Sequence, residues 1–222
     1  MTQRRPSKQI DALLETPIVL VVDDDEEVRE GLGSLFRSIG LDPKLFASTA
    51  EFLQHKVPEA PCCIVLDVRL PGVSGLDFQA QLANAHVHVP IIMMTGHGDI
   101  PMSVRAMKAG AVDFLTKPFR DQDMLDAVAQ AIERDRKRRD SEKALAELRR
   151  LFESLTARER EIMALVTSGL MNKQVAAQLG LREITVKIHR GHVMRKMGVR
   201  TLADLVRAAE ALELPHTQKS KE

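Results

Sequence analysis

The chain of 222 residues is 44% hydrophobic and 28% charged, which suits two modest globular domains better than one small core. It has no run of about 18 apolar residues, and its first basic residues, Arg4, Arg5 and Lys8, are not followed by the apolar core of a signal peptide. These features exclude a membrane span and a secretion signal, so we expect a cytoplasmic protein.

Charge is distributed unevenly, although the net charge is only +1. Residues 18–120 carry 9 Lys and Arg against 13 Asp and Glu, whereas residues 155–214 carry 10 against 6. An acidic first half joined to a basic second half is typical of a regulatory module tethered to a nucleic-acid binder. The lack of Trp and Tyr argues against binding of single strands by base stacking.

Short apolar runs alternate with helical patterns over residues 18–120. This alternation predicts a doubly wound, five-stranded parallel α/β sheet of the flavodoxin-like type. Ligand sites in such sheets lie beyond the carboxyl ends of the strands. Strands are expected at residues 18–22, 44–46, 62–66, 90–94 and 111–115, and helices at 26–38, 48–55, 75–83 and 102–109.

Polar residues follow the predicted strands. Asp23 and Asp24 follow the first strand, Asp67 the third, Thr95 the fourth and Lys117 the fifth. If the first and third strands are neighbours, about 4.8 Å apart, their carboxylates converge and repel one another unless a hard cation such as Mg²⁺ lies among them. A carboxylate beside that ion can accept a phosphoryl group, with the lysine and the hydroxyl to bind it. The acids could instead mark only a helix N-terminus, which would explain Asp25, Glu26 and Glu27 but not Asp67 or Lys117.

These residues resemble the receiver domain of two-component response regulators from Pro17 to about Arg120. The loop residues Pro71 and Gly75 after Asp67 also match the family. The resemblance implies that Asp67 is the phosphoacceptor, that Thr95 and Phe114 form the switch, and that Lys117 binds the phosphoryl group. It implies Mg²⁺ ligation by Asp23, Asp24, Asp67 and the backbone carbonyl of Arg69. Phe114 could also be an ordinary core residue, and Arg69 and His97 lie where the family tunes access to the phosphate.

No glycine or proline occurs between Phe119 and Ser168, so a long connecting helix is expected. It has one apolar stripe near Leu125, Val128 and Ile132. The 13 steps from Ile132 to Leu145 rotate by about 220°, so a second stripe, through Leu148, Phe152 and Leu155, faces another way. The second stripe could form a parallel coiled coil with a second subunit or pack on the C-terminal domain of the same chain. Between the two stripes lies a basic cluster made of Arg134, Arg136, Lys137, Arg138 and Arg139. Acidic residues alternate with these basic ones, which favours a solvated helix face over a contact with DNA.

The C-terminal region has the pattern of a helix-turn-helix domain. Thr156 and Glu159 form a capping box that opens a helix. A short helix at 172–179, a turn at Gly180 and a longer helix near 183–197 follow, and Thr201 caps a final helix. In this arrangement the longer helix enters the DNA major groove.

This region resembles the four-helix LuxR-type domain, through the runs 155–161, 169–173, 185–187 and 196–198. The resemblance implies contacts near base edges from Lys187, Ile188 and Arg190, and contacts on or near phosphates from Lys173, Thr185 and His189. Val186, Val193 and Met197 are expected in the core. Two positions depart from the family pattern. Arg182 replaces a serine-like helix cap, and Gly191 lies inside the recognition helix, either for close approach to DNA or as drift.

The chain is thus similar to response regulators of the FixJ/NarL type. We expect a receiver at 17–121, a helical linker at 122–153, a LuxR-type domain at 154–214 and flexible tails at 1–16 and 215–222. The resemblance implies a transcription regulator that accepts a phosphoryl group from a sensor histidine kinase, slowly hydrolyses it, and dimerises on promoter DNA. RNA polymerase is a further candidate partner, and no membrane is expected.

Two other functions stay open at this point. A constitutive DNA-binding regulator would use the receiver only as an interaction module. A phosphohydrolase would need a second catalytic acid or base near Asp67, and the next residues, Val68 and Arg69, supply none.

Overall fold

The computed structural model describes residues 15–96 and 100–214. His97 and the predicted tails, apart from Glu15 and Thr16, lie outside the described residues. The chain divides into two compact units at Arg139 and Asp140. This division falls inside the segment predicted to be the linker.

The first unit is a five-stranded parallel sheet in the order β2-β1-β3-β4-β5. The predicted doubly wound fold is therefore confirmed, including the pairing of β1 with β3. The strands are β1 (Ile18–Val22), β2 (Asp42–Phe46), β3 (Cys62–Asp67), β4 (Ile91–Thr95) and β5 (Asp113–Thr116). The helices are α2 (Glu26–Ser38), α3 (Thr49–Leu53), α4 (Gly75–Asn84), α5 (Ile100–Lys108) and the start of α6 (Asp121–Glu153).

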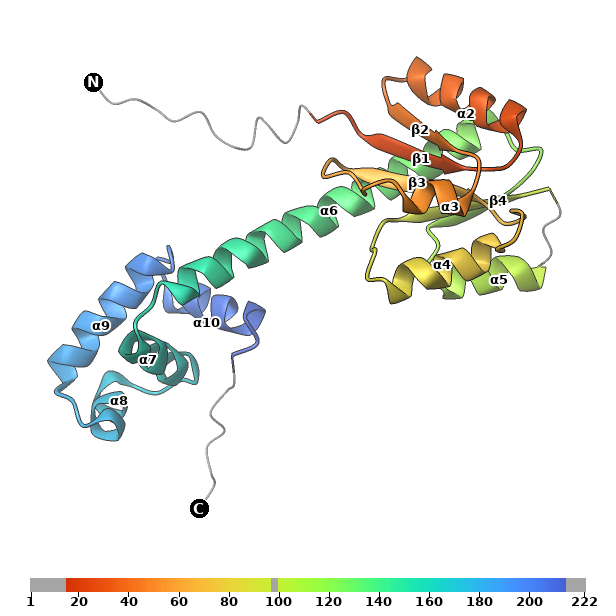
Figure 1. Cartoon of the computed structure of the whole chain (residues 1–222). Coiled ribbons are helices and arrows are strands. Elements are labelled where there is room, and N and C mark those ends of the chain that lie inside the picture. The colour runs from red at the N-terminus through yellow and green to blue at the C-terminus, as the bar shows by residue number, and fades with distance from the viewer. Residues whose placement is uncertain (1–14, 97–99, 215–222) are drawn as a thin grey trace, which may run out of the picture. The chain divides into compact units, whose positions relative to one another are not determined.

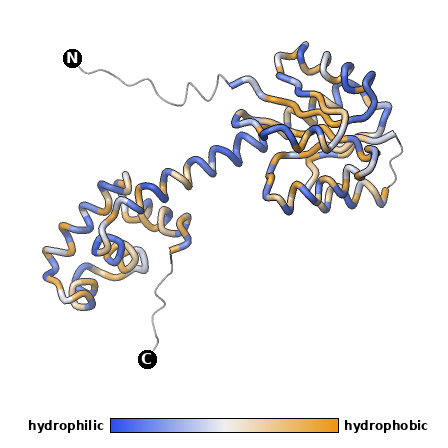
Figure 2. Tube along the Cα trace, in the orientation of Figure 1, coloured by the Kyte–Doolittle hydropathy of each residue, from blue (hydrophilic) through white to orange (hydrophobic). Residues whose placement is uncertain are grey.

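Helices cover both faces of the sheet (Figure 1). On one face, α3, α4 and α5 bury Phe52, Phe78 and Ala106 against alternate residues of the strands. On the other face, α2 and α6 bury Phe36 and Val128. The central strands β3 and β4 are apolar except for their last residues, Asp67 and Thr95, because both faces of these strands are covered (Figure 2).

The second unit contains the end of α6 and four further helices: α7 (Ala157–Thr167), α8 (Asn172–Leu179), α9 (Glu183–Lys196) and α10 (Leu202–Ala211). The capping box of Thr156 and Glu159 is present at the start of α7. Gly180 ends α8 with φ 64°, a left-handed conformation that favours glycine. No side chain caps α9 at Arg182, as its replacement of the usual serine-like residue predicted.

The second apolar stripe, which begins in α6 and extends past its end to Leu155, packs within its own chain. Leu148, Phe152 and Leu155 join a core with Val193 and Leu205 of the helical domain. Of the two arrangements open from the sequence, the structure therefore adopts packing on the same chain for these three residues. Leu145 is half-buried and lies outside this core.

The expectation that the basic cluster of α6 forms a solvated face is wrong for two of its members. Arg138 and Arg139 both bind Asp135, which is fully buried. Asp135 also accepts a hydrogen bond from the backbone N–H of Cys62 at 2.9 Å, and Arg139 donates to the carbonyl oxygens of Pro58 and Glu59. A buried carboxylate needs this many donors because burial removes its hydration. The network joins α6 to the beginning of β3.

Candidate functional site: an acidic cluster and a recognition helix

The carboxyl ends of β1, β3 and β5 bring three predicted site residues together. Lys117 Nζ lies 2.6 Å from Asp23 Oδ2 and 3.0 Å from Asp67 Oδ2. Asp67 Oδ1 accepts the backbone N–H of Arg69 at 3.1 Å, and Asp23 Oδ1 accepts that of Asp25 at 2.9 Å. Both carboxylates are buried, whereas Asp24 beside them is exposed.

This cluster contains more carboxylate groups than ammonium groups. Burial raises the pKa of Asp23, although hydrogen bonds from Lys117 and from the backbone of Asp25 lower it. Burial lowers the pKa of Lys117, but its bonds to Asp23 and Asp67 outweigh that effect and leave it raised. Two buried carboxylates thus share one ammonium group and the carboxylate of Asp24 lies nearby, so the site can accommodate further positive charge.

The donor set fits a magnesium ion. Single carboxylate oxygens from Asp23, Asp24 and Asp67 all lie within 4.8 Å of one another. Mg²⁺ prefers oxygen ligands and keeps several waters, so three acids and a backbone carbonyl would suffice. An open cavity of about 510 Å³ lies against the same place, lined by Asp24, Arg69, Pro71 and Met102 among others, and gives solvent access.

The loop beyond Asp67 requires a glycine. A Cβ atom at Gly75 would overlap the backbone oxygen of Asp67 and lie 2.9 Å from Val68 Cα. Ser74 caps α4 immediately before it by accepting the N–H of Leu76. The start of α4 is therefore held against the backbone of the predicted phosphoacceptor, as the match of Gly75 to the family loop suggested.

The two predicted switch residues lie on neighbouring strands. Thr95 is fully buried at the end of β4, and Phe114 is half-buried on β5, packed against the core. Phe114 pairs with Met93 in the strand register, and Thr95 with Thr116. Phe114 is thus partly solvent-accessible.

The sequence reasoning missed Arg29. Its side chain donates a 2.7 Å hydrogen bond from α2 to the backbone carbonyl of Asp23. One signal for it exists in the sequence: Arg29 is the first basic residue after the acidic run 23–27 and lies on the following helix. This bond fixes the backbone at Asp23, the first residue of the acidic pair.

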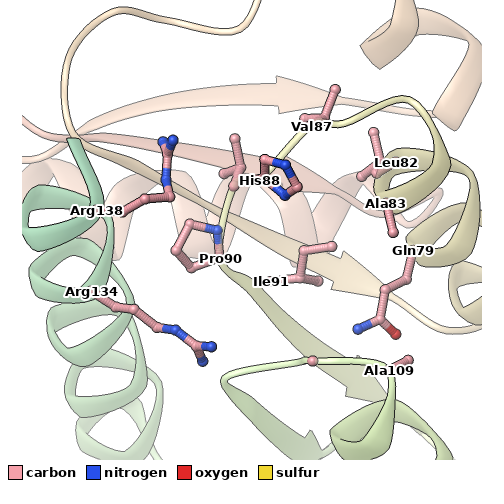
Figure 3. Close-up of a pocket in the computed structure, with 12 residues that line it drawn as sticks. Gln79, Leu82, Ala83, Val87, His88, Pro90, Ile91, Ala109, Arg134 and Arg138 are labelled. Atoms are coloured by element: carbon pink, nitrogen blue, oxygen red, sulfur yellow. The ribbon is translucent and has the colours of Figure 1, made fainter. Parts of the chain in front are cut away.

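A second cavity, of about 450 Å³, has a different lining that contains none of these acids. Figure 3 shows Arg134 reaching into it from α6 and the amide of Gln79 entering from α4, beneath Pro90 and Ile91. It adjoins the beginning of β4, whereas the acidic cluster lies at the strands' carboxyl ends. The cavity is therefore not part of the acidic site.

The predicted DNA-contacting residues lie on α8 and α9. Lys173, Lys187 and Ile188 are exposed, and the large apolar side chain of Ile188 keeps 53% of its surface accessible. Thr185, His189 and Arg190 are half-buried, and Arg190 donates to Asn172 Oδ1 at 3.3 Å. Val186, Val193 and Met197 are buried, which confirms that they face the core.

One ion pair of this domain was not foreseen from the sequence. Glu159 of the capping box accepts a 2.6 Å hydrogen bond from Lys196 at the end of α9. The hydrogen bond from Lys196, with those from Thr156, lowers the pKa of Glu159 to about 2 despite burial. Glu159 therefore ties α9 to the start of α7.

The helices of residues 15–96 and 100–214 include none whose length and hydrophobicity would let it span a bilayer.

Both halves of the chain match known protein families. Residues 19–129 match the response regulator receiver domain, and residues 153–209 match the bacterial regulatory proteins of the luxR family. Nodulation protein W of Bradyrhizobium diazoefficiens is 60% identical over 92% of this chain and 91% of its own length. The transcriptional regulatory protein FixJ of Azorhizobium caulinodans is 43% identical, over 86% and 90%.

Solved structures lead to the same family. The response regulator StyR is similar with a TM-score of 0.79 and 49% identity, covering 88% of this chain and 98% of that one. The chain therefore belongs to the response regulators of two-component systems, with a receiver domain followed by a LuxR-type DNA-binding domain.

Proposed function

We propose that this response regulator is switched by phosphorylation of Asp67 and binds promoter DNA as a dimer once phosphorylated. A sensor histidine kinase would donate the phosphoryl group. The observation that carries the proposal is the position of Lys117 between the buried carboxylates of Asp23 and Asp67, at 2.6 and 3.0 Å. The receiver would comprise residues 17–121, the linker 122–153 and the DNA-binding domain 154–214.

In the reaction, a carboxylate oxygen of Asp67 attacks the phosphorus of the donor, a P–O bond forms, and the bond to the donor imidazole breaks. Lys117 is placed to leave Asp67 and bind an oxygen of the transferred group. The hydroxyl of Thr95 would donate to another oxygen, which would draw β4 toward the site, and Phe114 would move inward with it. Mg²⁺ held by Asp23, Asp24, Asp67 and the Arg69 carbonyl would neutralise the charge that develops on the phosphoryl oxygens. Water could later hydrolyse the aspartyl phosphate slowly.

The surface that would respond is α5. Ile100, Val104 and Met107 are exposed by 79%, 44% and 46% of their surface, which is unusual for large apolar side chains on one short helix. The helix lies between Thr95 and Phe114 in the chain. A change at the phosphorylation site could therefore alter this face and allow a second copy to bind there.

Acetyl phosphate tests the chemistry directly. The full chain is incubated with acetyl phosphate and Mg²⁺ and its intact mass is measured beside that of Asp67→Asn, a variant of nearly the same shape. We expect one phosphoryl group on the wild-type chain and none on the variant. A wild-type chain that takes up no phosphoryl group at Asp67 would refute the proposal. If the phosphorylated chain bound DNA no better than the unmodified chain, the constitutive alternative would stand.

Lys173 should contribute to DNA affinity without reading sequence. It is exposed near the start of α8, where a phosphate contact would position the domain. Lys173→Ala should weaken binding to all duplexes alike and reduce the slope of log affinity against log salt by about 0.9. Fluorescence anisotropy on a duplex selected from a random pool measures both. Arg207→Ala, which removes an exposed α10 arginine paired with Asp204, should leave the slope unchanged.

The fold should tolerate a larger residue than glycine at position 191. A Cβ atom there would meet nothing within 4 Å, and the residue is exposed in the middle of α9. Gly191→Ala should therefore stabilise the helical domain by up to about 1 kcal/mol in thermal unfolding. Weaker DNA binding by this more stable variant would mean that the backbone approaches DNA closely, whereas unchanged binding would identify the glycine as drift.

A further inference from the structure

A second cluster of metal-ligating side chains lies in the helical domain and shares no residue with the acidic site. A carboxylate oxygen of Glu159 and one ring nitrogen each from His189 and His192 all lie within 4.8 Å of one another. The two histidines are three residues apart on α9, so they share a helix face. Glu159 comes from α7.

One oxygen of Glu159 remains available. Oε2 accepts from Lys196 Nζ at 2.6 Å, from the backbone N–H of Thr156 at 2.8 Å and from its hydroxyl at 3.1 Å. Oε1 lies 3.9 Å from His192 Nδ1, which is too long for a hydrogen bond. The carboxylate is buried and held rigidly by its other oxygen, so Oε1 is fixed in direction.

The two histidines can supply nitrogen ligands beside this oxygen. His189 Nδ1 is buried and has no hydrogen-bond partner among the described residues. An unsatisfied buried nitrogen costs free energy unless a donor or an ion meets it. His192 has a side chain 44% exposed, so it can rotate and leaves an entry path from solvent.

We propose that Glu159, His189 and His192 form a binding site for a zinc ion that links α9 to α7. Two imidazoles and one carboxylate, with water as the fourth ligand, are a common zinc donor set. Bonds of about 2.0–2.1 Å in a tetrahedral site place ligand atoms about 3.3 Å apart, so the side chains must close by on the order of 1 Å. The exposed His192 can make most of this movement.

The ammonium group of Lys196 beside Glu159 opposes a cation, but it does not block the site. Lys196 binds the other oxygen, and its Nζ also lies 3.3 Å from the carbonyl oxygen of Ser154. It can therefore keep an acceptor while Oε1 binds the ion. A site with two imidazole ligands should favour zinc over Mg²⁺, because imidazole nitrogen is a poor ligand for Mg²⁺.

Zinc would act on the recognition helix. Zinc bound only to the folded domain would stabilise it by RT ln(1 + [Zn²⁺]/Kd), and it would hold His189, which the proposed function places near a DNA phosphate. The effect on DNA binding rests on that proposed function, whereas metal binding itself does not.

The test measures zinc alone. The full chain, with excess Mg²⁺ to occupy the acidic cluster, competes with a chromophoric chelator for Zn²⁺, and Co²⁺ absorption reports the ligand geometry. His192→Ala should weaken binding by about 100-fold or more, since even outer-shell changes cost 10–100-fold. His88→Ala, which removes an exposed receiver histidine near His86, should bind like the wild type.

Equal zinc affinity in the wild type and His192→Ala would overturn the proposal, as would loss of binding in His88→Ala. Unchanged thermal unfolding of metal-free His192→Ala would show that its loss of binding is not a loss of fold. If that variant is destabilised, Glu159→Asp, which shortens the third ligand, should also weaken binding, and normal binding by Glu159→Asp would contradict the site. None of these measurements involves phosphorylation, so failure here leaves the proposed function untouched.

Discussion

Replacing Asp135 by alanine should destabilise the receiver by about 3–5 kcal/mol. The Asp135 carboxylate is fully buried and accepts hydrogen bonds from Arg138, Arg139 and the backbone of Cys62. Without it, two partly buried guanidinium groups and a buried N–H lose this acceptor. Removing one member of a buried ion pair costs far more than removing an exposed pair, because the remaining charge stays desolvated.

Urea unfolding followed by far-UV circular dichroism measures this loss, since the chain has no Trp or Tyr to serve as fluorescent probes. Hydrogen exchange would assign the destabilised transition to the sheet. Asp140→Ala on the same helix is the matched control, because Asp140 is exposed. If both variants unfolded at the same urea concentration, the Asp135 network would have no structural importance.

Glu159→Gln should destabilise the helical domain by about 1.5–3 kcal/mol at neutral pH. Glu159 is buried and holds Lys196 at 2.6 Å, and the neutral amide of Gln cannot replace that charge. Because folding lowers the pKa of Glu159 from 4.5 to about 2, its stabilisation is complete above pH 4.5 and is lost as the pH falls toward 2. The stability difference between wild type and variant should therefore shrink over that range.

Thermal unfolding between pH 2 and 7, with a chelator present to remove metal ions, follows this difference. Glu161→Gln is the control, because Glu161 pairs with Arg158 in an exposed ion pair of small value. A difference between wild type and Glu159→Gln that did not change with pH would contradict the role of this charge.

The strands of the receiver could be predicted because a strand is marked by its own short apolar run and by the polar residues that directly follow it. Both β1 and α2 have the predicted bounds, since an apolar run followed by acidic residues marks a strand and then a helix start. The convergence of Asp23, Asp67 and Lys117 could be foreseen from the general rule that parallel sheets gather side chains at their carboxyl edge.

Two of the residues that the sequence did not reveal, Asp135 and Glu159, owe their roles to contacts between residues distant in the chain. Asp135 looks like one of several alternating charges on a helix, and only its position against the N–H of Cys62, 73 residues earlier, shows that it is buried. Likewise, Glu159 is recognisable as a capping residue within its own turn, but its ion pair with Lys196 spans 37 residues. Local patterns carry no information about which helix face a distant strand will cover.

The mass of the full chain in solution tests the proposed switch most directly. Light scattering would be recorded in Mg²⁺ before and after acetyl phosphate, for the wild type and for Asp67→Asn. Phosphorylation should double the mass of the wild-type chain and leave the variant unchanged. A wild-type chain that carries the phosphoryl group on Asp67, yet keeps the same mass at every concentration, would contradict activation by dimerisation.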